Sequence, residues 1–207
     1  EIVGKLLAAL DELHLTDNTI IIFTSDNGTD NKGEAKSIRS AFQGQNVRGG
    51  KYFPTELGAN VPLIIRWPGK VAAGQTTKAL VDFTDILPTL CDLVDAPLQQ
   101  DQACDGRSLK PLFNEPRRPH KPFIYTWGDF EHNSRQYKHP ADYADKLLHV
   151  VRDDRWKLYS DGRLCDLHPD FLENTPLTPN ETAETKAAYQ RLQKQLENLR
   201  TSQPTRW

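Results

Sequence analysis

The 207-residue sequence is long enough to form one medium domain or two small ones with a buried core. Its 26 Lys and Arg residues nearly balance its 28 Asp and Glu residues, so the formal net charge is only −2. This balance argues against a nucleic-acid-binding protein, which would carry a basic surface. No run of about 18 apolar residues is present, so we expect no membrane-spanning helix.

The first half of the chain alternates helix and strand patterns. Apolar residues at helical spacing predict an amphipathic helix over residues 2–14. The β-branched run at 19–24 predicts a strand buried on both faces, as in a parallel sheet, and a second such strand follows at 61–67. Residues 29–50 between them are polar and predict a long loop, and a loop of that length generally has a function. With a helix predicted over 85–94, this order indicates an α/β layer architecture.

A cluster of prolines between residues 111 and 122 marks a change of composition, and we place a domain boundary near residue 115. Residues 1–114 would form part of a mixed-sheet α/β domain, and residues 115–207 a small α+β subdomain. The subdomain is predicted to contain an antiparallel sheet and one C-terminal helix, with strands at 123–127, 147–152, 156–160 and 164–167 and the helix at 181–199.

Asp26-Asn27-Gly28 follows the first predicted strand directly. Ligands of open α/β sheets bind just outside the carboxyl ends of strands. A carboxylate beside a carboxamide offers two hard oxygen ligands, which suit Ca²⁺ or Mg²⁺ better than zinc. The simpler interpretation is a surface turn, because Asp, Asn and Gly all favour turns.

Arg48-Gly49-Gly50-Lys51 is the second candidate motif. The two glycines allow the backbone to approach a ligand closely, and the lysine supplies a compact positive charge suited to a tetrahedral oxyanion. The simpler interpretation is a glycine turn with solvated basic neighbours.

Both motifs belong to an ordered series of blocks that resembles the sulfatase family over nearly the whole chain. The series consists of T-S-D-N-G, R-G-G-K, E-x-G-x-x-V-P from Glu56 to Pro62, R-W-P-G from Arg66 to Gly69, D-F-T-D-I-L-P-T-L from Asp82, D-G-R-S-L from Asp105, V-R-D-D-R-W-K-L-Y from Val151 and C-D-L from Cys165.

This resemblance implies a sulfuric ester hydrolase of the alkaline-phosphatase-like superfamily. Asp26 and Asn27 would be two ligands of a single Ca²⁺ ion, and Lys51 would be catalytic, contacting the sulfate and the bridging oxygen of the leaving group. The family's nucleophile is a formylglycine made from Cys or Ser in a C/S-x-P-S-R segment. Its substrate would be a sugar or aryl sulfate ester. Family habit also implies a secreted, periplasmic or lysosomal protein.

The sequence departs from the family pattern in several places. It has no C/S-x-P-S-R segment, and the paired aspartates and catalytic histidines that complete the family's site would lie upstream, so we expect an inactive C-terminal portion that exposes apolar surface and self-associates. Leu57 and Asn60 replace the commoner glycine and arginine and would tune the pocket or loop. An insertion at 129–145, with His132 and His139, is either ordinary surface or a wall that helps to choose the substrate.

Several alternatives remain open from the sequence. A phosphodiesterase or phosphonate monoester hydrolase of the same architecture is the first alternative to a sulfatase. A non-catalytic carbohydrate-binding or interaction module is the second. Among the three cysteines, Cys91 and Cys104 could close a short disulfide loop in an oxidising compartment, or all three could be free thiols.

Overall fold

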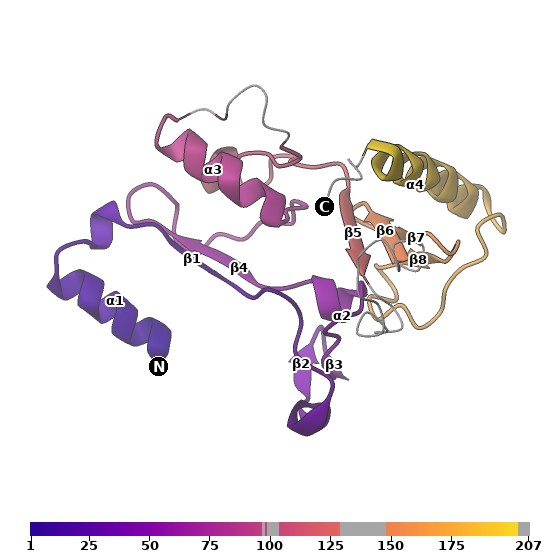
Figure 1. The fold of residues 1–207 in the computed structure, drawn as a ribbon, viewed down its shortest axis with the longest axis horizontal. Helices are drawn as coiled ribbons and strands as arrows, with labels where there is room; N and C mark the ends of the chain where they lie inside the picture. Colours follow the sequence, from indigo (N-terminus) through magenta and orange to yellow (C-terminus); the bar gives the residue numbers. More distant parts are fainter. Residues whose placement is uncertain (97, 99–103, 129–147, 203–207) are drawn as a thin grey trace, which may run out of the picture. The chain divides into compact units, whose positions relative to one another are not determined.

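The structure, a computed structural model, describes the chain except for residues 97, 99–103, 129–147 and 203–207 (Figure 1). The polypeptide forms two compact units, each built from two separate segments. Residues 1–25 and 62–121 form the first unit, and residues 26–61 and 122–207 form the second. The predicted domain boundary near 115 stays a prediction, because it rests on composition and these units rest on packing. None of the described helices is long and apolar enough to cross a membrane.

The first unit begins with helix α1 (Ile2–Glu12), which ends before the predicted residue 14 because His14 takes a left-handed backbone conformation, with φ of 55°. Strand β1 (Ile21–Thr24) then pairs with strand β4 (Leu63–Arg66). The two strands run antiparallel, so the parallel pairing that the apolar run suggested is wrong. A continuous apolar run is typical of parallel strands, but it does not fix the direction of the neighbouring strand.

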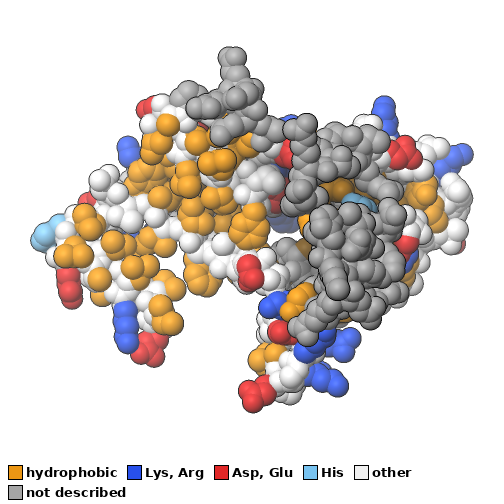
Figure 2. Space-filling view, in the orientation of Figure 1, with side chains coloured by type: hydrophobic (Ala, Val, Ile, Leu, Met, Phe, Trp, Pro, Cys, Tyr) orange, Lys and Arg blue, Asp and Glu red, His pale blue; other side chains and the backbone are white. Residues whose placement is uncertain are grey.

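The two strands are also less buried than predicted. Phe23 is 45% exposed and Ile64 is 58% exposed. Helix α1 contains no buried residue. Hydrophobic side chains therefore gather on the surface of this unit (Figure 2). This agrees with the expectation that apolar surface is exposed, whereas self-association stays a prediction.

The rest of the first unit consists of short helical elements held by a buried carboxylate. The 3₁₀ turn η3 (Phe83–Asp85) leads into helix α3 (Ile86–Leu93), and a further turn, η4, spans Lys110–Phe113. Asp85 is completely buried. It accepts hydrogen bonds from the Arg107 N–H at 2.7 Å and the Asp82 N–H at 3.0 Å. The core of the unit is formed by Leu109, Leu112 and Phe113 with partly buried neighbours that include Leu63 and Ile65 of β4 and Ile20, just before β1.

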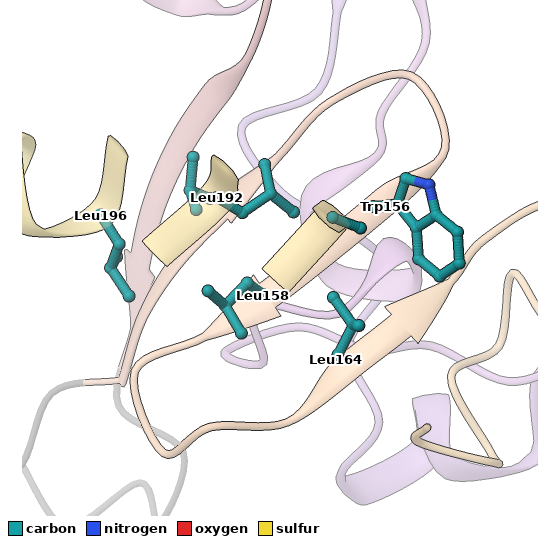
Figure 3. Packing of buried hydrophobic residues seen from close by; sticks show 7 residues of the cluster. Trp156, Leu158, Leu164, Leu192 and Leu196 are labelled. Carbon is teal, nitrogen blue, oxygen red and sulfur yellow. The ribbon is translucent and has the colours of Figure 1, made fainter. Parts of the chain in front are cut away.

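The second unit contains a four-stranded antiparallel sheet in the order β5-β6-β7-β8, as predicted. The strands are β5 (Ile124–Gly128), β6 (Leu148–Arg152), β7 (Trp156–Tyr159) and β8 (Leu164–Asp166). Helix α4 (Ala183–Ser202) packs on β6 and β7. Figure 3 shows Leu192 and Leu196 of this helix against Trp156, Leu158 and Leu164 of the sheet. Each large apolar side chain buried in this way contributes about 1.5–3 kcal/mol.

Segment 26–61 also belongs to the second unit, and its structure corrects the prediction of a long loop over 29–50. It contains the 3₁₀ turn η2 (Gly33–Ser37) and a hairpin of strands β2 (Ser40–Phe42) and β3 (Gln45–Val47). Gln43 and Gly44 at the tip have φ of 48° and 77°, the left-handed pair that a tight hairpin turn requires. The ring of Phe42 lies 5.1 Å from that of Phe171 in an edge contact, centroid to centroid. Helix α2 (Glu56–Ala59) follows.

The three cysteines are free thiols in the structure, with Cys91 half-buried, Cys104 exposed and Cys165 buried. The possible Cys91–Cys104 bridge is therefore not formed. His132 and His139, with the insertion that carries them, lie outside the described residues.

Candidate functional site

The predicted ligand pair lies where the chain leaves strand β1. Asp26 is exposed and Asn27 is half-buried. The Asn27 amide Nδ2 donates a hydrogen bond to Asp26 Oδ2 at 2.5 Å. The two side chains therefore lie against each other.

The backbone brings this pair to the R-G-G-K motif. The Lys51 N–H donates to the Thr29 carbonyl at 3.1 Å, and the Gly28 N–H donates to the Gly58 carbonyl at 2.8 Å. Three segments that lie apart in sequence, 26–29, 48–51 and 56–60, are thus joined by main-chain hydrogen bonds. The structure therefore brings together the motifs that carry all three predicted site residues.

Glycines make this close packing possible. A Cβ on Gly28 would overlap the carbonyl oxygen of Leu57, and a Cβ on Gly49 would overlap the carbonyl oxygen of Thr29. Any other residue at these two positions would push the segments apart. The glycines of both motifs consequently set the spacing between the candidate metal ligands and Lys51.

The Lys51 side chain is half-buried and lies over an aromatic ring. Its Nζ is 5.4 Å from the centroid of the Tyr52 ring, and Nζ of Lys32 lies at the same distance from that ring. Tyr52 has φ of 77°, an uncommon conformation for a residue with a large side chain. Two ammonium groups held near one ring give this turn a concentrated positive charge, which suits a compact anion.

The ligand chemistry fits part of a calcium site. A carboxylate and a carboxamide are hard oxygen ligands of the kind that Ca²⁺ takes, but the ion takes six to eight such ligands. Within the described residues no group of three or more His, Cys, Asp and Glu side chains is placed to hold a metal. Asp26 and Asn27 could therefore hold a Ca²⁺ ion only together with ligands from elsewhere.

Sequence reasoning assigned no role to a buried group of charges beside this turn. Lys157, on β7, is only 2% exposed, yet its Nζ lies 3.1 Å from Glu56 Oε1 and 3.0 Å from Glu173 Oε1. Arg152 Nη1 lies 2.6 Å from the other Glu56 oxygen, Oε2. The Tyr159 hydroxyl donates to Glu173 Oε2. We call Glu56, Arg152, Lys157, Tyr159 and Glu173 the buried charge network.

The two carboxylates of the network are balanced by its two cations. Burial acts to raise the pKa of Glu56, but the charges of Lys157 and Arg152 outweigh it and hold that pKa below its ordinary value. Burial, together with the Glu173 carboxylate, raises the pKa of Tyr159, which stays protonated and able to donate. The sequence feature that could have indicated this network is Lys157, which lies between the apolar residues Trp156 and Leu158. The strand that carries it is buried along its whole length.

Comparison with solved structures identifies the fold class. A protein solved in complex with its substrate D-glucosamine-2-N,6-O-disulfate matches 96% of this chain with a TM-score of 0.71 and 26% identity. The phosphonate monoester hydrolase of Agrobacterium radiobacter matches 96% of it with a TM-score of 0.68 and 27% identity. The chain covers 37% and 38% of those two proteins. It therefore has the alkaline-phosphatase-like α/β fold, as predicted.

Comparison of sequences identifies the family. The model described as Sulfatase matches residues 1–96, and the model described as N-sulphoglucosamine sulphohydrolase, C-terminal, matches residues 50–202. Human arylsulfatase H is 40% identical over 168 residues, covering 77% of this chain and 28% of that protein. Human steryl-sulfatase is 43% identical over 112 residues, covering 53% of this chain and 19% of that protein. The chain belongs to the sulfatase family.

The matched part is a minor share of each curated relative. The N-acetylgalactosamine-6-O-sulfatase of Bacteroides thetaiotaomicron, for example, is 40% identical over 110 residues, which are 51% of this chain and 21% of that enzyme. The chain thus spans between 19% and 28% of the length of these three relatives.

Proposed function

We propose that this chain is the C-terminal part of a Ca²⁺-dependent sulfuric ester hydrolase and contributes Asp26, Asn27 and Lys51 to its active site. The observation that carries the proposal is the set of main-chain hydrogen bonds that join the segments of these residues. The Lys51 N–H donates to the Thr29 carbonyl, and the Gly28 N–H donates to the Gly58 carbonyl. Membership of the sulfatase family supports the same reading. The short share of each relative that the chain spans supports a site completed by residues outside it.

In this proposal Lys51 binds the sulfate group of the substrate. Its ammonium would donate to the sulfate and to the bridging oxygen, where negative charge grows as the sulfur–oxygen bond breaks. Asp26 and Asn27 would hold part of the coordination of a Ca²⁺ ion, which when bound supplies charge that neutralises the sulfate. The nucleophile, a formylglycine in our proposal, would come from a segment outside these 207 residues.

The proposed substrate is the sulfate ester of a sugar or an aryl alcohol. Support comes from a solved structure that contains a sulfated glucosamine as its substrate and from relatives named as steryl, aryl and amino-sugar sulfatases. We further propose a secreted, periplasmic or lysosomal location, by analogy with the family.

A phosphonate monoester hydrolase is the second candidate, favoured by the match to the Agrobacterium radiobacter enzyme. Assays of the full-length protein on paired aryl sulfate, phosphate diester and phosphonate ester substrates test both. A kcat/KM for the sulfate ester well above that for the other two supports the sulfatase. The reverse order supports the second candidate.

The isolated 207-residue chain provides a further test. It should release no sulfate above background, with or without added calcium, because reacting groups must be held within about 1 Å of their productive positions. Sulfate release by this chain that is abolished by Lys51→Ala would overturn the proposed division of the site. Full-length protein that binds sulfated saccharides without hydrolysing any ester would instead support a non-catalytic module.

A further inference from the structure

We infer that the buried charge network positions the candidate sulfate site: Glu56, held by Arg152 and Lys157, fixes the turn at residues 50–58 that carries Lys51 and holds Gly28. This inference rests on the proposed function for its link to catalysis. The residues of the network do not touch the substrate. They act on the candidate site through the backbone that carries Lys51.

Burying the charges of the network costs free energy. Lysine and glutamate are almost never fully buried unless they are paired, and a buried ion pair contributes little stability compared with apolar side chains of the same shape. Here Lys157 is 2% exposed and Glu56 is 7% exposed. Two apolar clusters already pack this sheet, one with α4 and one that includes Tyr159 itself. We therefore infer that the network serves to fix one conformation of the chain around it.

The network acts at the start of helix α2. Glu56 is the first residue of α2 (Figure 1), and its backbone N–H donates to Glu173 Oε1 at 2.8 Å. The Tyr159 hydroxyl lies 3.5 Å from the Pro54 carbonyl oxygen. The Glu56 side chain is thus tied to β6 and β7, and its main chain is tied to Glu173, which Lys157 of β7 contacts. Glu173 itself has φ of 60°, so its backbone adopts an uncommon conformation while it makes these contacts.

Main-chain hydrogen bonds connect α2 to the candidate site. The Gly58 carbonyl of α2 accepts the Gly28 N–H, and Gly28 follows Asp26 and Asn27 directly. On the other side, the Phe53 N–H donates to the Gly50 carbonyl at 3.0 Å, which closes the turn next to Lys51. A movement of α2 would therefore move the ligand pair and the lysine at once. The network holds the part of the chain on which their spacing depends.

Asn60 adds one more contact to the same carboxylate. Its Nδ2 donates to Glu56 Oε2 at 3.2 Å, the oxygen that also faces Arg152. Glu56 consequently accepts from three side chains, and neither of its oxygens is left without a donor. A glutamine could not replace it, because its amide NH₂ would face a cation in either orientation, Arg152 or Lys157, with no lone pair to offer.

The test uses the full-length protein and two separate measurements. The first is amide hydrogen exchange at Gly28 and Lys51, which reports the two joining hydrogen bonds without requiring activity. The second is kcat and KM on an aryl sulfate ester, normalised to the folded fraction. The variants are Glu56→Gln and, in case Glu56→Gln does not fold, the partly exposed Arg152→Met with its conservative partner Arg152→Lys.

We expect Glu56→Gln and Arg152→Met to speed exchange at both amides by at least about tenfold. We also expect kcat to fall by about tenfold to a hundredfold, because misplacement of about 1 Å costs about a hundredfold, with a smaller change in KM. Arg152→Lys should restore most of both. Arg155→Met is the matched control, because Arg155 pairs with Asp166 at 2.7 Å elsewhere on the same sheet. It should lower Tm and leave kcat unchanged.

Normal exchange at Gly28 and Lys51 together with wild-type kcat in folded Glu56→Gln or Arg152→Met would overturn the inference and leave a purely structural network. A full-length wild type that hydrolyses no sulfate ester would overturn the proposed function instead. In that case, faster exchange in the variants would still support the positioning of the turn, and unchanged exchange would refute it.

Discussion

The ammonium group of Lys121 lies 2.8 Å from Oδ1 of Asp85, a carboxylate with no exposed surface at all. Lys121, whose side chain is 7% exposed, also lies 2.9 Å from Asp82, so one lysine joins the residue before η3 to the last residue of η3. Since breaking a buried ion pair leaves a charge without compensation, Lys121→Met should lower the free energy of unfolding by about 3–5 kcal/mol. Urea unfolding checks this, with Lys110→Met as the exposed control. Equal effects of the two variants would contradict it.

The same pair predicts how stability depends on pH. Burial acts to raise the pKa of Asp85, but hydrogen bonds from Lys121 and from two backbone N–H groups outweigh it and lower that pKa below its ordinary value of 3.8. A carboxyl group with a depressed folded pKa contributes stability above its unfolded pKa and loses it as pH falls through the folded value. The wild type should therefore lose stability below about pH 4 more steeply than Asp85→Asn, as measured by urea midpoints across that range.

Lys51 is predicted to matter for turnover and not for folding. In the full-length protein, Lys51→Ala should lower kcat/KM for a sulfate ester by at least about a hundredfold, the usual loss for one group that stabilises developing charge. Its Tm should stay close to that of the wild type, because the side chain makes no ion pair within the described residues. Lys36→Ala, an exposed lysine on η2, is the control. Normal turnover in Lys51→Ala would remove Lys51 from the site.

Calcium should bind the isolated chain only weakly. Asp26 and Asn27 provide two side chains where the ion wants six to eight oxygens, so we expect a Kd on the order of millimolar or weaker. Titration calorimetry measures it, with Asp26→Ala as the test of location and Asp30→Ala, four residues further along, as the control. Micromolar calcium binding that is unchanged in Asp26→Ala would contradict the assignment of Asp26 as a calcium ligand.

The thiols should be distinguishable by their reactivity. All three should titrate in denatured, unreduced protein, because no disulfide is present in the structure. In the native chain, exposed Cys104 should react first. Cys165 should react last, since burial raises its pKa to about 12 and keeps the thiolate scarce at neutral pH. A count of one thiol would restore the Cys91–Cys104 bridge.

The isolated chain should self-associate through its first unit. Ile2 is 85% exposed and Leu6 is 52% exposed on α1, and Ile64 is 58% exposed on β4. Contiguous apolar surface of this kind favours association. Sedimentation velocity should show concentration-dependent growth in mass that Leu6→Gln weakens and Glu12→Gln does not. A single monomeric species at high concentration would refute this.

Local pattern was enough to predict most of the individual elements. The helical spacing at the N-terminus, the two β-branched runs and the four short strands of the C-terminal sheet all appear close to their predicted places. Their signals lie within a few residues and depend on side-chain period, which the sequence states directly. The hairpin at 40–47 was missed because its strands are three residues long and mostly exposed, so they carry no apolar alternation.

Relations between distant segments could not be predicted in this way. The antiparallel pairing of β1 with β4 depends on the course of the chain between them. The contact between Glu56 and Lys157 joins residues 101 positions apart, and nothing near either residue indicates the other. The resemblance to sulfatases named Asp26, Asn27 and Lys51 because short motifs surround them. It gave Glu56 no role, because that role depends on packing.

The order of the segments in the two units has a consequence for how the protein can be divided. The chain passes between the units three times, near residues 25, 61 and 121. A protease cutting once near residue 121 would sever the polypeptide without dismantling either unit, since residues 26–61 would stay covalently on the N-terminal piece while packing with 122–207. The nicked protein should migrate as one particle under native conditions and as two bands only after denaturation. The peptide bonds thus join residues 26–61 to the first unit, whereas their packing contacts hold them to residues 122–207.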